Sequence, residues 1–153
     1  MIDAQLTHDF WLREFLRSQV ATRIGHDIEP TLDEVANIKR LCTLLLQPIR
    51  DSLGRSITIT SGLRPVWLNT LIGGAPNSEH IYARAADFIV QGMTPYAVTM
   101  KIASMNLPFN QLIFEKSWSH ISVAPEGATP KREILTAHFA NGRVTYTTGV
   151  SQS

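Results

Sequence analysis

An Asn-Gly pair near the end of the chain places the strongest local constraint on the fold. Asn141-Gly142 separates two segments rich in β-branched and aromatic residues, Ile134 to Ala140 and Arg143 to Thr148. A two-residue Asn-Gly loop favours a turn with positive φ at both positions, and such a turn joins two adjacent antiparallel strands. The sequence therefore predicts a C-terminal β-hairpin.

Four more segments alternate in the way typical of strands. They are Ser56 to Thr60, Ala85 to Val90, Gln111 to Glu115 and Trp118 to Val123. The last two are separated only by Lys116-Ser117, which is the spacing of a tight hairpin. We therefore expect most of the sheet to be antiparallel and to lie in the second half of the chain.

Helical periodicity dominates the first half. Predicted helices run from Asp9 to about Arg23, from Thr31 to Leu53, from Pro65 to Leu71 and from Thr94 to Met105. In the second, Thr31 and Glu34 form a capping-box pattern, Pro48 is expected to kink the helix, and Gly54 to end it. This order predicts an α+β fold, with N-terminal helices packed on a mainly antiparallel sheet.

Length and composition limit the possible classes of protein. With 153 residues we expect one domain: a helical lead-in over 1–54, a core over 55–125 and a C-terminal hairpin region over 126–153. The net charge of +1 gives no reason to expect a nucleic-acid partner. The lone cysteine, Cys42, excludes an internal disulfide and lies in an apolar run, so we expect it to be buried.

The N-terminal residues lack the basic start and apolar segment of a signal peptide, and no apolar run approaches the ~20 residues of a membrane helix. We therefore expect cytoplasmic synthesis without membrane insertion.

Two segments carry residues suited to metal chemistry. Ser78-Glu79-His80 is followed by Asp87 seven positions after His80, and His120 lies on the predicted strand that begins at Trp118. A catalytic zinc site uses three nitrogen or oxygen ligands and keeps one position open, so two imidazoles and a carboxylate fit. Spacing alone leaves these residues, like His8, His26 and His138, equally compatible with structural or surface positions.

Several motifs in order resemble the zinc D-Ala-D-Ala carboxypeptidase family, which includes D,D-dipeptidases and phage endolysins and has a hedgehog-like fold. They are Ser61-Gly62-Leu63-Arg64-Pro65, Ile72-Gly73-Gly74-Ala75-Pro76-Asn77-Ser78-Glu79-His80, Ala85-Ala86-Asp87, Gln111-Leu112-Ile113 and Trp118-Ser119-His120-Ile121-Ser122. The match extends over roughly residues 55 to 125. The resemblance implies a zinc peptidase that acts on peptidoglycan stem peptides.

Residue by residue, the resemblance implies that His80, Asp87 and His120 bind Zn²⁺. It implies that Arg64 contacts substrate or stabilises developing negative charge, and that Ser78 orients His80 or contacts substrate. Trp118 and Trp67 are each a candidate for lining the cleft or for the core.

The candidate general base does not stand at either of the positions that the family uses. Relatives have an acid three residues before the last ligand or a histidine two residues before it, where this chain has Ser117 and Trp118. If Lys116-Ser117 forms a turn, Glu115 shares a sheet face with His120 and is the candidate base. A solvent-exposed hairpin glutamate is the alternative. Glu79 is a weaker candidate because neighbouring side chains point apart.

Ala83 stands where many relatives have glycine, so the shape of the loop before Asp87 is open.

The expected function is zinc-dependent hydrolysis of stem peptides, of the D,D-carboxypeptidase type, by a monomer that reaches the cell wall after release, as in phage or prophage lysis. One alternative is an L-Ala-D-Glu endopeptidase. The other is a non-catalytic zinc-containing module that binds cell wall or belongs to a virion.

Overall fold

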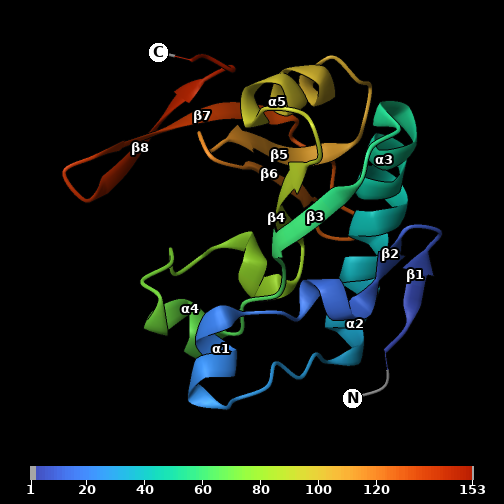
Figure 1. Ribbon diagram of the computed structural model, residues 1–153, viewed down its shortest axis with the longest axis vertical. Helices are drawn as coiled ribbons and strands as arrows, with labels where there is room; N and C mark the ends of the chain where they lie inside the picture. Colours follow the sequence, from blue (N-terminus) through green and yellow to red (C-terminus); the bar gives the residue numbers. More distant parts are fainter. Residues whose placement is uncertain (1–2, 153) are drawn as a thin grey trace.

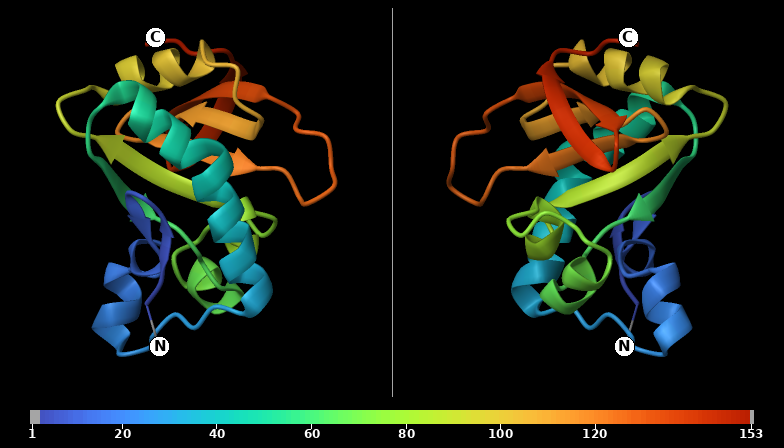
Figure 2. Two further views of the ribbon diagram at one scale, coloured as in Figure 1. Left: turned by 90° about the vertical axis from the view of Figure 1, so that its right-hand side faces the viewer. Right: turned by 90° about the vertical axis from the view of Figure 1, so that its left-hand side faces the viewer.

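A six-stranded mixed sheet, a second two-stranded sheet near the N-terminus and the helices around them make up the described part of the molecule (Figures 1 and 2). The structure, a computed structural model, describes residues 3–152. The strands are β1 Gln5–Thr7, β2 Phe10–Trp11, β3 Ile57–Ser61, β4 Ala85–Val90, β5 Phe109–Phe114, β6 Ser119–Val123, β7 Glu133–Ala140 and β8 Arg143–Thr148. The α-helices are α1 Gln19–Ile24, α2 Leu32–Leu41, α3 Gln47–Leu53, α4 Val66–Leu71 and α5 Pro95–Ala103. Shorter turns of helix are η1 Leu12–Phe15, η2 Cys42–Leu46 and η3 Glu79–Tyr82.

Within residues 3–152, six strands form the main sheet in the order β3-β4-β6-β5-β7-β8. All neighbouring strands are antiparallel except β5 and β7, which are parallel. The parallel pair arises because the segment 124–132 returns the chain to the start of β5, where Arg132 N–H donates to the Phe109 carbonyl at 3.1 Å. The predicted α+β class with a mainly antiparallel sheet is confirmed.

The two faces of this sheet differ in what packs against them. Phe88, Leu112 and Ile121 are fully buried on the face against which α2 and α5 pack. Side chains alternate along a strand, so Asp87 and His120 lie on the opposite face. We call this second face the site face, because it carries the polar cluster described below.

The long helical segment from α2 to α3 crosses in front of the sheet in the left-hand view of Figure 2. Thr31 Oγ1 accepts from Glu34 N–H at 3.1 Å, and Glu34 Oε1 accepts from Thr31 N–H at 2.8 Å, which confirms the capping box. Gly54, with φ 63°, ends α3 as predicted. Between α2 and α3 the turn η2 is a π-helix that ends at Leu46, two residues before Pro48, whose missing N–H removes one helical hydrogen bond.

Cys42 lies in η2 and is fully buried, as predicted. Among the described residues, no helix has the length and apolar character needed to span a membrane.

The helix predicted from Asp9 to Arg23 is wrong. The segment contains β2, then η1, and α1 begins only after Ser18. Two polar side chains bind nearby backbone N–H groups and start new elements: Glu14 accepts from Trp11 N–H at 2.6 Å, and Ser18 Oγ accepts from Ala21 N–H at 3.2 Å. These local hydrogen bonds compete with one continuous helix, although the apolar spacing suits it.

The C-terminal hairpin forms as predicted, with Ala140 paired to Arg143. Asn141 has φ 54° and Gly142 φ 72°, the positive values that a two-residue turn of this kind requires. In Figure 1 the hairpin of β7 and β8 extends away from the helices.

Candidate metal centre

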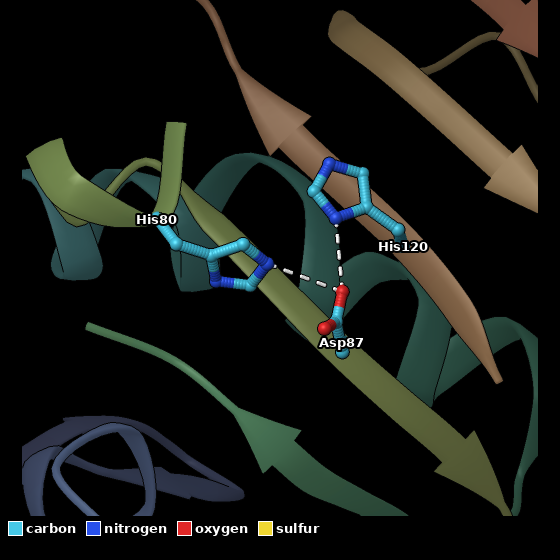
Figure 3. A group of neighbouring side chains, drawn as sticks. All are labelled: His80, Asp87 and His120. Carbon is cyan, nitrogen blue, oxygen red and sulfur yellow. Dashed lines mark hydrogen bonds and ion pairs between the residues drawn. The ribbon is translucent and has the colours of Figure 1, made fainter. Parts of the chain in front are cut away.

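Three side chains converge on the site face (Figure 3). Asp87 on β4 and His120 on β6 are direct cross-strand partners, and His80 comes from η3. Asp87 Oδ1 lies 3.2 Å from His80 Nε2 and 2.9 Å from His120 Nδ1. One ligand atom from each residue fits within 4.8 Å of the others. The structure thus brings together the three residues that the family resemblance implied as metal ligands.

His80 is held by the turn that contains Gly62. His80 Nδ1 lies 2.8 Å from the Gly62 carbonyl, so it donates, and Nε2 is left as the acceptor nitrogen facing Asp87. Ser78 Oγ accepts from the His80 backbone N–H at 3.2 Å, which agrees with an orienting role for Ser78. A Cβ on Gly62 would lie 2.5 Å from the Phe15 carbonyl oxygen, so only glycine brings this carbonyl to the ring.

The three side chains of the cluster are largely buried, and the pKa values of its two histidines shift in opposite directions. Burial lowers the pKa of His80. Burial also opposes the charged form of His120, but the hydrogen bond and negative charge of Asp87 outweigh it and raise the pKa of His120. For Asp87, burial is outweighed by the electrostatic interactions with the two histidines, which hold its pKa well below the ordinary value. Asp87 is therefore ionised at neutral pH, the form that binds a metal.

This donor set fits a divalent cation such as zinc. Two buried imidazoles direct ring nitrogens at the same carboxylate oxygen, Asp87 Oδ1, and a cation among them would satisfy all three groups. Two nitrogens and one oxygen match a catalytic zinc site with an open position. The hydrogen bond from His80 to the Gly62 carbonyl is the kind of outer contact that orients a ligating imidazole.

Glu115 lies beside this cluster on the site face. Its N–H donates to the Trp118 carbonyl at 3.0 Å, which confirms the predicted pairing of these residues across the turn. Ile113 pairs with His120, so Glu115, two residues further along, points to the same side. Burial raises the pKa of Glu115, and the charge of Asp87 adds to the rise, while His120 and Arg64 act against it.

Arg64 faces the same two acids. Burial lowers its pKa, whereas the charges of Asp87 and Glu115 raise it. The Arg64 Nε is buried and makes no hydrogen bond with any described residue. The backbone N–H of Arg64 donates to the His80 carbonyl at 3.0 Å, which ties Arg64 to the turn η3 that carries His80. The guanidinium thus holds a buried donor without a partner among the described residues, within electrostatic range of Asp87 and Glu115.

Trp118 is partly buried at the end of the turn that joins β5 and β6, and its ring lies 6.3 Å from that of Phe139. Trp67 instead packs against the core and stacks on His26 at 4.1 Å. The ring of His138 bonds the Thr147 hydroxyl, so His26 and His138 both lie outside the cluster.

Glu79 is a residue whose role the sequence did not reveal. Its Oε1 accepts from Ser122 Oγ at 3.0 Å and from Asn110 Nδ2 at 3.1 Å, and its Oε2 lies 3.7 Å from Arg84 Nε. Ser122 is two positions from His120, so Glu79 fastens η3 to the strand that carries a ligand. Its place next to His80 was visible in the sequence, but these partners come from tertiary structure.

Ala83 adopts φ 60°, the left-handed conformation that favours glycine. The cost for an alanine is roughly 1–2 kcal/mol. Its N–H bonds the His80 carbonyl at 3.2 Å, and Arg84 N–H bonds the Glu79 carbonyl at 3.1 Å. The alanine therefore adopts the tight left-handed turn, which answers the question left open by the sequence about the shape of the loop before Asp87.

Comparisons with known proteins agree with this geometry. The family described as Peptidase M15 matches residues 8–124. A 43-residue stretch is 46% identical to the zinc D-Ala-D-Ala carboxypeptidase of Streptomyces albus G, and it covers 28% of this chain and 17% of that protein. The chain thus matches well under two thirds of that relative's length. The matched residues 8–124 include His80, Asp87 and His120. The match confirms the family that the motifs indicated. The chain belongs to the peptidase M15 family.

Proposed function

We propose that this chain is a zinc-dependent peptidase that hydrolyses peptide bonds in peptidoglycan stem peptides, most directly as a D,D-carboxypeptidase. The observation that carries the proposal is the convergence of His80, Asp87 and His120 within 4.8 Å on a sheet face that also carries Glu115. The name of the Streptomyces albus G relative supports the choice of zinc and of D-Ala-D-Ala as substrate.

His80, Asp87 and His120 would hold the ion. When bound, zinc supplies a Lewis acid that polarises a carbonyl and makes water more acidic. The protein's part is to keep Asp87 ionised, to present Nε2 of His80 and Nδ1 of His120, and to fix the His80 ring through the hydrogen bond from its Nδ1 to the Gly62 carbonyl.

Glu115 is the proposed general base. A half-buried carboxylate with a raised pKa can take a proton from the attacking water and return it to the leaving amine. Arg64, whose positive charge acts on Asp87 and Glu115, is suited to hold a substrate carboxylate or the developing oxyanion. Ser78 acts through His80 by accepting its backbone N–H. Trp118 is a proposed substrate contact.

The first experiment is digestion of purified peptidoglycan by zinc-loaded protein, followed by mass spectrometry of the soluble fragments. Release of D-alanine supports the D,D-carboxypeptidase. A cut between L-Ala and D-Glu would replace it with the endopeptidase. Chelator-treated protein should release nothing until zinc is restored. No release under any condition would favour the non-catalytic binding module.

A second experiment tests the base. Glu115→Gln should keep zinc and lose activity by about 10²–10⁴-fold, the usual contribution of general acid–base catalysis. The matched control is Glu126→Gln, because Glu126 is exposed in the segment between β6 and β7. Full activity in Glu115→Gln would exclude this glutamate as the base. Action in phage or prophage lysis stays a prediction.

A further inference from the structure

The C-terminal hairpin continues the site face across the sheet. Cross-strand pairs set one row of residues on this face: Asp87 with His120, His120 with Ile113, Ile113 with Leu135, and Leu135 with Thr148. The next row contains Trp118 and Glu115, joined by a backbone hydrogen bond, and then Ala137 paired with Tyr146. Tyr146 of β8 therefore lies in the same row of the site face as Glu115, the proposed base.

The residue between Glu115 and Tyr146 in this row is small. Neighbouring strands lie about 4.8 Å apart, so two strand spacings separate the two backbones by about 10 Å. Ala137 occupies the intervening position and is fully buried. A tyrosine ring can lean over an alanine, and the polar end of Tyr146 can then approach the acids. In agreement, the pKa of Tyr146 is raised, by burial first and then by the charges of Glu115 and Asp87.

The apolar pattern of the hairpin is reversed relative to the centre of the sheet. In β4 and β6, the large apolar side chains Phe88 and Ile121 point to the helix-covered face. In the hairpin, Phe139, Val144 and Tyr146 point to the site face and are 54%, 43% and 48% exposed. We call these three residues with Trp118 the hairpin platform, since the rings of Trp118 and Phe139 lie 6.3 Å apart.

We propose that the hairpin platform is the wall of the substrate cleft on the side of Glu115, and that Tyr146 contacts the stem peptide through its hydroxyl group. The proposal rests on the function proposed above. A stem peptide offers alanine methyl groups for an apolar wall, and backbone carbonyl or carboxylate oxygens for a phenol donor. The substrate is the favoured occupant because the platform is continuous with Glu115, and the positive charge of Arg64 acts on the same acids.

Binding is measured apart from turnover. In zinc-loaded protein carrying Glu115→Gln, titration calorimetry gives the Kd for the synthetic peptide L-Ala-γ-D-Glu-L-Lys-D-Ala-D-Ala. Tyr146→Ala and Phe139→Ala should each raise Kd about tenfold, as expected for loss of a buried aromatic contact. Tyr146→Phe, which removes one hydrogen bond, should raise Kd about threefold. The matched control is Thr145→Ala, because Thr145 is exposed on the opposite face of β8 and should leave Kd unchanged.

Zinc content and far-UV circular dichroism of each variant show whether the fold is kept. If the alanine variants lose the fold, Tyr146→Phe decides, since it retains the ring. Platform variants that bind like Thr145→Ala, in a protein that still cleaves cell wall, would overturn this inference and leave the proposed function standing. If zinc-loaded protein with native Glu115 neither binds nor cleaves the peptide or cell wall, both proposals fail.

Discussion

The centre of the sheet and its C-terminal hairpin use polar side chains in opposite ways. At the centre, His80 and His120 are buried and each directs a ring nitrogen at Asp87 Oδ1, and Glu79 gathers Ser122 and Asn110 around one oxygen. In the hairpin, every residue of β8 is exposed.

The difference predicts where substitutions act. Removing one partner from a buried polar network leaves the others without hydrogen bonds in a low dielectric, which is costly. Removing an exposed partner lets water replace it. The centre should therefore govern metal binding and stability, and the hairpin should govern contacts with ligands.

The largest expected effect is on metal affinity. Asp87→Asn keeps the shape of the side chain but removes the charge that two histidines share. We expect zinc affinity to fall by about 100-fold or more, beyond the effect of losing an outer contact. Competition with a chromogenic chelator measures it. His138→Ala, on the hairpin, is the control and should bind zinc normally. Unchanged zinc affinity in Asp87→Asn would show that the centre of the sheet does not govern metal binding.

The next effect is on stability. Glu79→Ala leaves the fully buried Ser122 hydroxyl without its acceptor and Arg84 without its nearby carboxylate. We expect a loss of about 2–3 kcal/mol in the free energy of unfolding of the metal-free protein, measured with urea. Glu133→Ala removes an exposed bond to Gln111, of 2.8 Å, and should cost about 0.5 kcal/mol or less. Equal losses would show that burial does not separate the two networks.

Local sequence patterns were enough for the elements with strong chemical boundaries. The Asn141-Gly142 turn, the Thr31 capping box and the end of α3 at Gly54 each depend on a residue and its immediate neighbours. The ordered motifs likewise identified His80, Asp87 and His120, which the structure brings together. Spacing alone did not distinguish them from other polar residues.

The remaining features depend on contacts between distant segments. The parallel pairing of β5 and β7 follows from the path of residues 124–132, which no turn motif encodes. The hydrogen bond from His80 to Gly62 spans 18 positions, and that from Ser122 to Glu79 spans 43. In the N-terminal segment, the apolar spacing indicated a helix, but Glu14 and Ser18 divide it through local hydrogen bonds.

A substitution in the turn tests whether the hairpin is an independent unit. Gly142 has φ 72°, and alanine there should cost roughly 1–2 kcal/mol of local stability. Hydrogen exchange of Gly142→Ala should accelerate for amides of β7 and β8 and stay unchanged in β4 and β6. Asn141→Gly is the control, because glycine adopts the same positive φ without strain. Faster exchange throughout the sheet would show that the two regions unfold together.

The smallest effects come from two hydrogen bonds of equal length. Ser119 Oγ lies 2.8 Å from Thr99 Oγ1 in the buried face, and Thr147 Oγ1 lies 2.8 Å from His138 Nε2 on the exposed hairpin. Ser119→Ala should cost about 1 kcal/mol, because Thr99 keeps its bond to the Pro95 carbonyl, while the 2.8 Å bond to Ser119 and a longer Ser119 bond of 3.5 Å to the same carbonyl are lost. Thr147→Ala should cost a few tenths, about 0.3 kcal/mol, since water can replace the hydroxyl at His138. Urea unfolding of both variants compares them directly. Because the two bonds match in length, a difference in cost isolates burial as the cause, and a larger loss for Thr147→Ala would reverse the contrast.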